Sequence, residues 1–467
     1  MLLNIEKLIY GGDGLARLPA DERGRGKAVF APFVLAGEKV EAALTEEKSG
    51  FARAQLKAIV EPSPYRVAPG CPHFGRCGGC HYQHASYEHQ LEIKREILRE
   101  NLRRIAKLEL QSEIMVHPSP PWNYRNRSRL QVQTAPEFAA GYYKLRSHAL
   151  LPVEECPISS PLVNRGIAAL WATGRAGKAA AGVAEVEFFA NAEDTELLVE
   201  VSCRTEARRA AVREWAEELI TALPEIQGVA AFRDTKQETQ ETQEAQEAQE
   251  TLLHIGAGEL TYRTRQAAFR VSAGAFFQTN RHLIDELVSV VTAGCSGELA
   301  VDFYAGVGLF STALACNFRH IVSVESSQTA AADLAHNLPT NGEAVRAATE
   351  HYLKREFGGG RTDRGTSNSG KLGGEKPGED KRDRDKPGRE RPDLVVVDPP
   401  RGGLGEAVAR AVADLSAPRI TYVSCDPATL ARDLVMLLGA GYRVEEAHLI
   451  DLFPQTYHLE SVMRLVR

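Results

Sequence analysis

The sequence predicts an α/β protein with three parts: a small N-terminal β-barrel in residues 1–62, a central α+β domain in 63–271, and a doubly wound domain in 272–467. From about residue 272 onward, apolar strand-like runs alternate with helical patterns, as in a parallel sheet covered by helices on both faces. The first sixty residues alternate short apolar runs with Gly, Pro and charge, as small β-barrels do. A chain of 467 residues is also too long for one hydrophobic core.

The barrel is predicted from four short apolar segments separated by turn residues: Leu2 to Ile5, Gly26 to Phe30, Lys39 to Ala43, and Arg53 to Val60. After it, apolar residues recur at helical spacing between Tyr87 and Lys107, with charged residues between them. Residues 114–270 are rich in strand-like runs and contain helical patterns near 161–173 and 205–222. We therefore expect one long helix followed by a mixed α+β domain.

The C-terminal domain is predicted to contain five apolar strands, at residues 299–303, 320–324, 394–397, 420–424 and 461–466. Helical patterns lie between them, notably at 281–293, 309–317 and 427–439. Two segments interrupt this plan. A Gln/Glu/Thr/Ala repeat at 235–251 has no apolar face and is predicted to be a solvated excursion within a hairpin connection. Residues 357–392 are rich in Gly, Arg, Asp, Lys and Pro and are predicted to form a disordered loop.

The composition is that of an ordinary soluble protein, with 43% hydrophobic and 25% charged residues. We find no apolar stretch long enough to span a bilayer and no secretory leader, so we expect a cytoplasmic location. The net charge of -6 argues only weakly against a nucleic-acid partner, because charge is distributed unevenly. Residues 235–251 hold five Glu and one Lys, whereas residues 61–175 hold 15 Lys and Arg against 10 Asp and Glu. Local surface charge, rather than the total, decides phosphate binding.

Three polar motifs follow apolar strands and should share one crevice at the carboxyl ends of the sheet. They are Asp302-Phe303-Tyr304-Ala305-Gly306-Val307-Gly308, Asp398-Pro399-Pro400-Arg401 and Ser424-Cys425-Asp426-Pro427. A thiol, a carboxylate and a glycine turn would then meet in one pocket. Cys425 alone could be a small buried hydrophobe, but the neighbouring Asp398 and Asp426 favour a nucleophile.

The glycine turn indicates a nucleotide-like ligand, and a strand ending in Glu325 could bind the ribose hydroxyls. Glu325 could instead be a solvated strand end. The turn is not Gly-x-Gly-x-x-Gly, which disfavours a dinucleotide, and no Walker-type Lys follows it, which disfavours ATP. Adenosyl-methionine is therefore the best fit.

Four cysteines form a metal-binding pattern. Cys71, Cys77 and Cys80 have x5 and x2 spacing, and Cys156 followed by Pro157 lies much further along the chain. Such spacing predicts a metal or a cluster, although it does not separate zinc from iron–sulfur. It also differs from the x3-x2 spacing of radical adenosyl-methionine enzymes.

Together these motifs resemble the uracil-5 RNA methyltransferases, in particular those that act on 23S rRNA and carry a TRAM domain and an iron–sulfur cluster. The resemblance also covers His458-Leu459-Glu460 and the run Ala275 to Asn280. It implies that Glu460 is the base, that Gln278, Tyr304 and Glu325 contact adenosyl-methionine, and that Asp398 lies between the cofactor and the target base. It also implies a [4Fe–4S] cluster on Cys71, Cys77, Cys80 and Cys156 and an RNA-binding TRAM barrel at the N-terminus.

The chemistry supports this resemblance, because carbon 5 of uracil becomes nucleophilic only after a thiolate adds to carbon 6. Arg125, Arg127 and Arg129 alternate along one strand next to aromatic residues and could follow an RNA backbone, or could form a solvated strand face. The 357–392 segment could alternatively be an RNA-touching arm. Uracil must leave its stack to reach Cys425, so a single-stranded loop or a flipped base is required.

We therefore predict a monomeric enzyme that makes 5-methyluridine in RNA, with ribosomal RNA preferred as the substrate. The alternatives are a transfer-RNA uracil-5-methyltransferase and a non-catalytic RNA-binding assembly factor. An adenine methyltransferase is disfavoured, because Arg401 rather than an aromatic residue follows Asp398-Pro399-Pro400.

Overall fold

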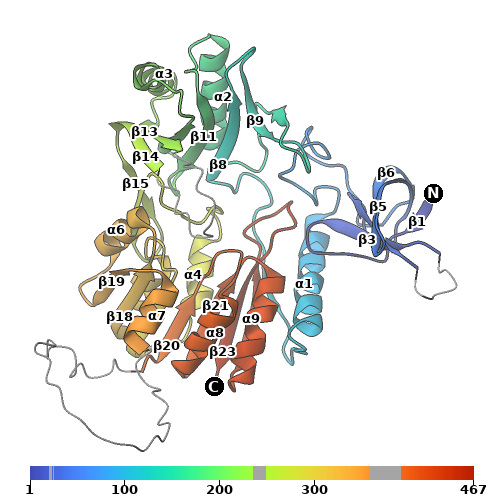
Figure 1. The fold of residues 1–467 in the computed structure, drawn as a ribbon, viewed down its shortest axis with the longest axis vertical. Coiled ribbons are helices and arrows are strands. Elements are labelled where there is room, and N and C mark those ends of the chain that lie inside the picture. Colours follow the sequence, from blue (N-terminus) through green and yellow to red (C-terminus); the bar gives the residue numbers. More distant parts are fainter. Residues whose placement is uncertain (20–23, 25, 235–248, 358–390) are drawn as a thin grey trace, which may run out of the picture.

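The computed structural model describes residues 1–19, 24, 26–234, 249–357 and 391–467. Figure 1 shows three regions: an N-terminal sheet at one side, a central region at the top and a larger α/β region below. The long helix α1 (Tyr87–Arg104) runs between the N-terminal sheet and the α/β region. Most of the predicted inserts 235–251 and 357–392 lies outside the described residues. Gln249 to Thr251 belong to a strand and Phe357 ends a helix, so both inserts are shorter than predicted.

The N-terminal region is a six-stranded sheet in the order β1-β5-β6-β4-β3-β2. Its strands are β1 (Leu2–Asn4), β2 (Lys7–Leu8), β3 (Asp13–Arg17), β4 (Ala28–Pro32), β5 (Lys39–Glu47) and β6 (Phe51–Glu61). Four of them contain the predicted segments, whereas β2 and β3 were not predicted. Small and β-branched residues such as Ala16, Val29 and Val40 fill its interior. Among the described residues no ladder joins β1 to β2, so the predicted barrel is confirmed in part, as a half-barrel sheet.

The central region is a seven-stranded mixed sheet in the order β10-β9-β8-β11-β12-β13-β14, with two helices packed on it. The strands are β8 (Arg127–Gln133), β9 (Ala139–Tyr143), β10 (Leu150–Pro152), β11 (Val183–Ala190), β12 (Leu197–Cys203), β13 (Ile226–Asp234) and β14 (Gln249–Gly256). The helices are α2 (Pro161–Arg175) and α3 (Arg209–Ala222), which confirms the two predicted helical patterns. The separate hairpin β15 (Glu259–Arg263) and β16 (Ala268–Ser272) leads to the C-terminal region.

The C-terminal sheet has eight strands in the order β19-β18-β17-β20-β21-β23-β22-β7. They are β7 (Met115–His117), β17 (Gly297–Phe303), β18 (Phe318–Glu325), β19 (Gly342–Arg346), β20 (Leu394–Val397), β21 (Arg419–Ser424), β22 (Arg443–Ile450) and β23 (Glu460–Val466). The strands from β19 to β21 are parallel, and β23 is antiparallel to both of its neighbours. The five predicted strands are confirmed. The sequence analysis missed β19 and β22, whose outer halves carry charge and lack a continuous apolar run.

Helices cover both faces of this sheet, which confirms the doubly wound arrangement. One face holds α4 (Ile284–Thr292), α5 (Leu309–Leu314) and α6 (Gln328–Asn337). The other holds α7 (Thr349–Phe357), α8 (Gly405–Asp414), α9 (Pro427–Gly439) and α1. Val395 and Val397 face the second group while Val396 faces the first, because side chains alternate along a strand.

Segments from the predicted central domain complete this core. Ile97, Leu98 and Leu102 of α1 pack in the same cluster as Leu430 and Leu434 of α9. In addition, β7 adds a parallel edge strand to β22. Two segments that follow the N-terminal sheet in the sequence, α1 and β7, are therefore part of the C-terminal core and sheet. No helix among the described residues is long and apolar enough to cross a bilayer.

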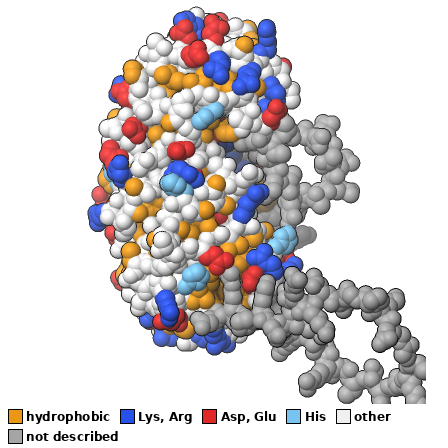
Figure 2. All heavy atoms as spheres, turned by 90° about the vertical axis from the view of Figure 1, so that its left-hand side faces the viewer, with side chains coloured by type: hydrophobic (Ala, Val, Ile, Leu, Met, Phe, Trp, Pro, Cys, Tyr) orange, Lys and Arg blue, Asp and Glu red, His pale blue; other side chains and the backbone are white. Residues whose placement is uncertain are grey.

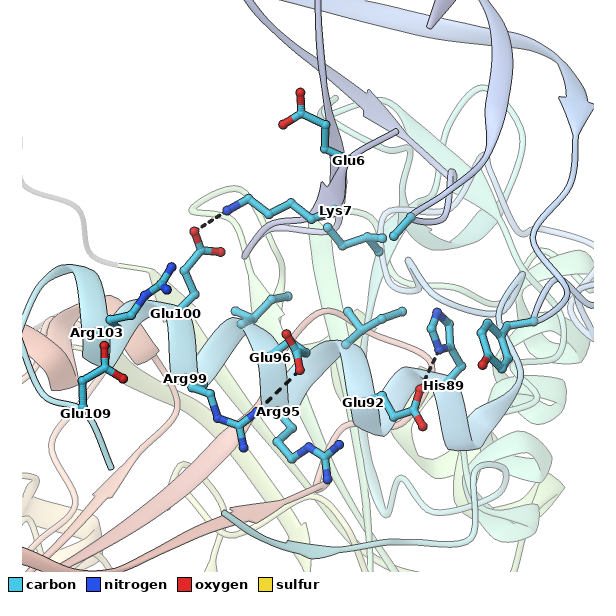
Figure 3. A pocket seen from close by; sticks show the side chains of 15 residues that line it. Glu6, Lys7, His89, Glu92, Arg95, Glu96, Arg99, Glu100, Arg103 and Glu109 are labelled. Carbon is cyan, nitrogen blue, oxygen red and sulfur yellow. Dashed lines mark hydrogen bonds and ion pairs between the residues drawn. The ribbon is translucent and has the colours of Figure 1, made fainter. Parts of the chain in front are cut away.

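The N-terminal sheet is attached to α1 across a groove of about 650 Å³ (Figure 3). Lys7 of β2 forms an ion pair with Glu100 of α1, and the Tyr65 ring stacks on His89 at 4.1 Å. The groove walls are charged, and none of the predicted site residues lines them.

Candidate active site

The sheet reverses its winding direction at β17, which has β18 on one side and β20 on the other. In an open parallel sheet, ligands bind in the crevice outside the strand ends at such a point. Tyr304 follows β17, Asp398 follows β20, and Cys425 follows β21. The structure therefore places the three polar motifs at one edge of the sheet, as the sequence predicts.

Cys425 occupies a single-residue link between a strand and a helix. Ser424 is the last residue of β21, and Asp426 is the N-cap of α9. The Asp426 carboxylate accepts hydrogen bonds from the backbone N–H groups of Ala428 and Thr429, at 2.9 and 3.0 Å. Pro427 lies at the first helical position, where its missing N–H group costs no hydrogen bond within the helix. This local structure holds the thiol, which is partly exposed, at the carboxyl end of β21.

Glu460 is brought to Cys425 by long-range strand pairing. It begins β23, which lies antiparallel to β21 with Ser461 opposite Ser424. Continuing this register by one residue sets Glu460 across from Cys425. The Ser461 hydroxyl also donates to the Ser424 carbonyl at 3.2 Å, which tightens the junction. Glu460 is 4% exposed, so its carboxyl group lies in a poorly solvated environment.

The turn after Asp398 is attached to the start of α9 by several hydrogen bonds. The Thr429 hydroxyl donates to the Arg401 carbonyl at 3.1 Å, and the Arg432 guanidinium donates to the Gly402 carbonyl at 2.7 Å. The Leu404 N–H donates to Asp433 at 2.6 Å. These bonds hold the Arg401 guanidinium beside His458, to which it donates at 3.3 Å.

Burial and like charge raise the pKa values of Cys425, Asp398 and Glu460. Burial, Glu460 and Asp398 raise the pKa of the Cys425 thiol to about 12, while Arg401 opposes this change. Burial and the nearby Asp302 raise the pKa of Asp398 to about 7. Burial and Asp398 raise the pKa of Glu460 well above its usual range. Perturbed acids that share a crevice are typical of functional sites.

The cofactor side of the crevice has features that fit adenosyl-methionine. Tyr304 and Gly306 both have left-handed backbone, with φ of 62° and 55°. The Glu325 carboxylate accepts the N–H of Gly306 at 2.9 Å and that of Ser327 at 2.7 Å. Gly308 has a φ of 95°, a backbone conformation that favours glycine. Glu325 is therefore a structural partner of the glycine turn and not a freely solvated strand end.

Asp302 was part of the predicted turn motif but had no assigned role. It is fully buried, and its Oδ1 has no hydrogen-bond partner among the described residues. Burial raises its pKa to about 7. Asp302 also contributes to the raised pKa of Asp398, so the two carboxyl groups lie close together at the ends of β17 and β20.

The other two predicted cofactor residues lie on the segments flanking this crevice. Tyr304 is partly buried, and its hydroxyl lies beside Thr349 at the start of α7. Gln278 is 8% exposed and lies between β16 and α4. The Gln278 carbonyl accepts from the Asn126 side chain at 3.4 Å, and this contact joins Gln278 to the central region.

The loop that precedes Glu460 is held by side chains from α1. Lys94 donates to Asp451 at 2.6 Å, and both side chains are fully buried. The Gln90 and Gln455 side chains are joined at 3.0 Å, and the Gln455 N–H donates to Gln90 at 2.9 Å. Sequence analysis missed this network, because helical periodicity does not show that a Lys on the apolar face has a buried acidic partner.

Arg401, Tyr10 and His458 are site residues to which sequence analysis gave no role. Burial and Arg401 lower the pKa of His458 to about 3, so the ring is neutral and accepts from Arg401. The Tyr10 hydroxyl donates to the Cys425 carbonyl at 3.1 Å, across 415 residues of sequence. Arg401 and His458 both stand in motifs that the sequence shows, whereas nothing in the sequence points to Tyr10.

The four predicted metal ligands lie around one cavity of about 190 Å³. Cys71, Cys77, Cys80 and Cys156 are all free of disulfide bonds. The N–H groups of His73 and Gly79 donate to the sulfurs of Cys71 and Cys77, both at 3.4 Å. Among the described residues no three such side chains are arranged to hold one metal ion, so the cluster on these cysteines stays a prediction.

The predicted RNA-tracking strand is partly wrong. Arg127 is 8% exposed and donates to Glu187, to Glu200 and to the Ala275 carbonyl. Arg129 also pairs with Glu187. This buried network joins the central sheet to the segment before α4. The positive charges of Arg127 and Arg129 are neutralised in it by glutamates. Figure 2 shows acidic and basic side chains interspersed on the face that it presents, so no single charge dominates there.

The fold and the glycine turn together are those of an adenosyl-methionine-dependent methyltransferase. A sequence profile of the family described as tRNA (Uracil-5-)-methyltransferase matches residues 86–357 and 390–467, and a profile of the TRAM domain matches residues 1–57. The chain therefore belongs to the uracil-5 RNA methyltransferase family and is an adenosyl-methionine-dependent RNA (uracil-5-)-methyltransferase.

Individual relatives span the whole chain. The 23S rRNA (uracil(1939)-C(5))-methyltransferase RlmD of Chromohalobacter salexigens is 32% identical over 470 residues, covering 100% of this chain and 89% of that protein. An uncharacterized RNA methyltransferase of Caldanaerobacter subterraneus is 29% identical over 483 residues, covering 100% and 97%. The crystal structure of the Pyrococcus abyssi tRNA (uracil-54, C5)-methyltransferase in complex with S-adenosyl-L-homocysteine superposes with a TM-score of 0.70 at 23% identity, covering 100% of both chains. That likeness shows a common fold.

Proposed function

We propose that this protein methylates carbon 5 of a specific uridine in 23S ribosomal RNA, with Cys425 as the nucleophile and Glu460 as the base. The observation that supports this assignment is that Ser424 and Ser461 are paired across β21 and β23, so Cys425 and Glu460 are the next residues beyond that pair, and Glu460 is close enough to raise the pKa of the Cys425 thiol. Neither group has an evident structural purpose there, since both are partly or fully desolvated and repel each other when ionised.

The first step is the addition of the Cys425 thiolate to carbon 6 of the flipped uracil. A carbon–sulfur bond forms, and the electrons of the C5–C6 double bond move toward O4, which makes carbon 5 nucleophilic. The raised pKa of Cys425 means that the thiolate is scarce in the free protein, although it is a strong nucleophile once formed. The Arg401 guanidinium stabilises the thiolate, whereas the Glu460 and Asp398 carboxylates destabilise it.

Adenosyl-methionine, when bound, supplies an electrophilic methyl group. Tyr304, Glu325 and Gln278 would hold the cofactor beside the strand ends, and Asp398 would lie between it and the uracil. Tyr304 and Glu325 are held rigidly by the left-handed turn and by two backbone N–H groups, which is the preorganisation that such binding requires.

Glu460 completes the reaction once carbon 5 carries both a methyl group and a proton. Its carboxylate takes that proton, the C5–C6 double bond re-forms, and the C6–S bond breaks to release the Cys425 thiolate. The raised pKa makes the Glu460 carboxylate a stronger base than a solvated one. A positioned base of this kind contributes roughly 10²–10⁴ in rate.

Ribosomal RNA is proposed as the substrate for three reasons: the TRAM domain, the four-cysteine cavity, and the relative from Chromohalobacter salexigens that is named as a 23S rRNA enzyme. A transfer RNA is the second candidate, since the family description and the Pyrococcus abyssi structure both name tRNA. The four cysteines are proposed to hold a [4Fe–4S] cluster that braces the RNA-binding region outside the methyl-transfer crevice.

The test of the nucleophile is Cys425→Ala. We expect this variant to lose methylation while it still binds adenosyl-methionine, because the thiol acts on uracil and not on the cofactor. Cys316→Ala, which alters an exposed cysteine, is the control and should leave both unchanged. Appreciable 5-methyluridine formation by Cys425→Ala would refute the mechanism.

The test of the substrate is the position of 5-methyluridine in RNA from a deletion strain. Loss of the modification from 23S rRNA alone would support the proposal. Loss from transfer RNA alone would make the second candidate correct.

A further inference from the structure

The turn between β2 and β3 of the N-terminal sheet reaches into the active crevice. Tyr10, Gly11 and Gly12 form its tip, and both glycines have left-handed backbone with φ of 102° and 90°. A Cβ on Gly12 would lie 3.0 Å from the His81 side chain, so the tip packs closely against the segment that follows the cysteines. Glycine is therefore required here both for the backbone conformation and for the close approach.

Tyr10 makes a specific contact with the nucleophile's own peptide unit. Its hydroxyl donates to the Cys425 carbonyl at 3.1 Å. Its ring meets the Tyr457 ring edge-on, with centroids 5.5 Å apart and an interplanar angle of 89°. Burial and the nearby Asp426 raise the pKa of Tyr10, so the hydroxyl remains a donor at any working pH.

A hydrogen bond at this carbonyl limits the direction of the thiol. Because the peptide group is planar, fixing the Cys425 carbonyl fixes the plane that joins Cys425 to Asp426. Asp426 is already held by its N-cap bonds to α9, and Ser424 by the sheet. Cys425 lies between these two restrained residues, and the Tyr10 hydroxyl restrains the Cys425 carbonyl as a third contact.

We propose that Tyr10 is a positioning residue for the Cys425 thiol, so that the N-terminal sheet takes part in the chemical step as well as in RNA capture. This inference rests on the proposed role of Cys425 as the nucleophile. If the sheet only captured RNA, removing the Tyr10 hydroxyl would weaken RNA binding or change nothing. If it orients the thiol, the same change slows attack on carbon 6 and leaves RNA binding as it was.

The decisive variant is Tyr10→Phe, which removes one oxygen atom and keeps the ring contact with Tyr457. Its matched control is Tyr442→Phe. Tyr442 also donates its hydroxyl to a backbone carbonyl, that of Ala417 at 2.8 Å, but it does so before the start of β21 rather than after its end. Both changes therefore delete the same kind of hydrogen bond at opposite ends of one strand.

The substrate is either a 23S rRNA transcript or total tRNA, whichever accepts methyl groups from the unaltered protein. The assay measures overall turnover and formation of the covalent adduct separately. Steady-state turnover with labelled adenosyl-methionine gives kcat and the KM for RNA. Single-turnover mixing with a transcript containing 5-fluorouridine gives the rate of adduct formation on denaturing gels. Fluorine at carbon 5 cannot be removed as a proton, so the adduct persists.

For Tyr10→Phe we expect kcat and the adduct rate to fall about 3- to 10-fold, as for one neutral hydrogen bond, with an RNA KM within about twofold of normal. Tyr442→Phe should leave the adduct rate of the folded protein unchanged. An unchanged kcat in Tyr10→Phe, or a change in KM alone, would overturn the inference while the function stood. Normal 5-methyluridine formation by Cys425→Ala would instead overturn the function.

Discussion

The buried ion pair between Lys94 and Asp451 offers a sharp test of how α1 supports the catalytic loop. Both side chains are 0% exposed, and the Lys94 ammonium also donates to the Phe453 carbonyl at 2.9 Å. Lys94→Met keeps the length of the side chain and removes its charge. Asp451 is then left as a buried carboxylate without its cation, which costs about 3–5 kcal/mol of local stability.

An exposed pair provides the matched control. Lys354 and Glu350 of α7 also lie 2.6 Å apart, but their side chains are 70% and 45% exposed. Lys354→Met is the same substitution at the same distance, and it should cost about 0.3–0.5 kcal/mol because water replaces the lost partner. The two variants therefore differ mainly in burial.

Amide hydrogen exchange is the suitable assay, since the protein has several regions and need not unfold in two states. The backbone N–H groups of His81 and Tyr82 donate to the Gln455 carbonyl at 2.9 Å and report whether the loop is closed. With Lys94→Met we expect their exchange to accelerate about 10²- to 10⁴-fold, the equivalent of the predicted energy. Adding Asp451→Asn should restore more than half of the protection. Acceleration below about tenfold, or no recovery in the double variant, would refute the reasoning.

Four further predictions concern the reaction and the cysteine cavity. Glu460→Gln should slow product release about 10²- to 10⁴-fold and cause the covalent Cys425–RNA adduct to accumulate on denaturing gels; normal turnover without a shifted band would reject its role as the base. Because Cys425 has its pKa raised to about 12, the adduct rate should rise about tenfold per pH unit between pH 7 and 9, in proportion to the thiolate fraction. Arg401→Gln removes the cation that opposes this shift and should slow adduct formation about tenfold, whereas Arg401→Lys should recover part of the loss; equal rates for Gln and Lys would contradict an electrostatic role. Protein purified without oxygen should be brown with about four iron atoms per chain, and Cys77→Ala should lose iron and RNA affinity before cofactor binding; a colourless protein with one zinc would overturn the cluster.

The sequence by itself determined the elements whose signals are local. The apolar run Leu394 to Val397 can only be a buried strand, and the polar Asp398-Pro399-Pro400 that follows must lie at its end. Ser424-Cys425-Asp426-Pro427 carries its own N-cap and helix start, which is why the position of the thiol was predicted correctly. The spacing of the cysteines and the helical period of α1 are local in the same sense.

The tertiary structure alone decided which of these groups meet. Glu460 reaches Cys425 because β23 returns antiparallel between β21 and β22, and a strand's sequence does not specify its neighbour or its register. Arg127 resembles an RNA contact in the sequence but is buried against Glu187 and Glu200, which come from two other strands.

Tyr10 touches Cys425 across 415 residues, and Lys94 reaches Asp451 across 357. Such contacts depend on how separately folded layers pack together. Periodicity and spacing along the chain do not predict that packing. Its stabilising free energy comes from burial of surfaces that only the folded state brings together.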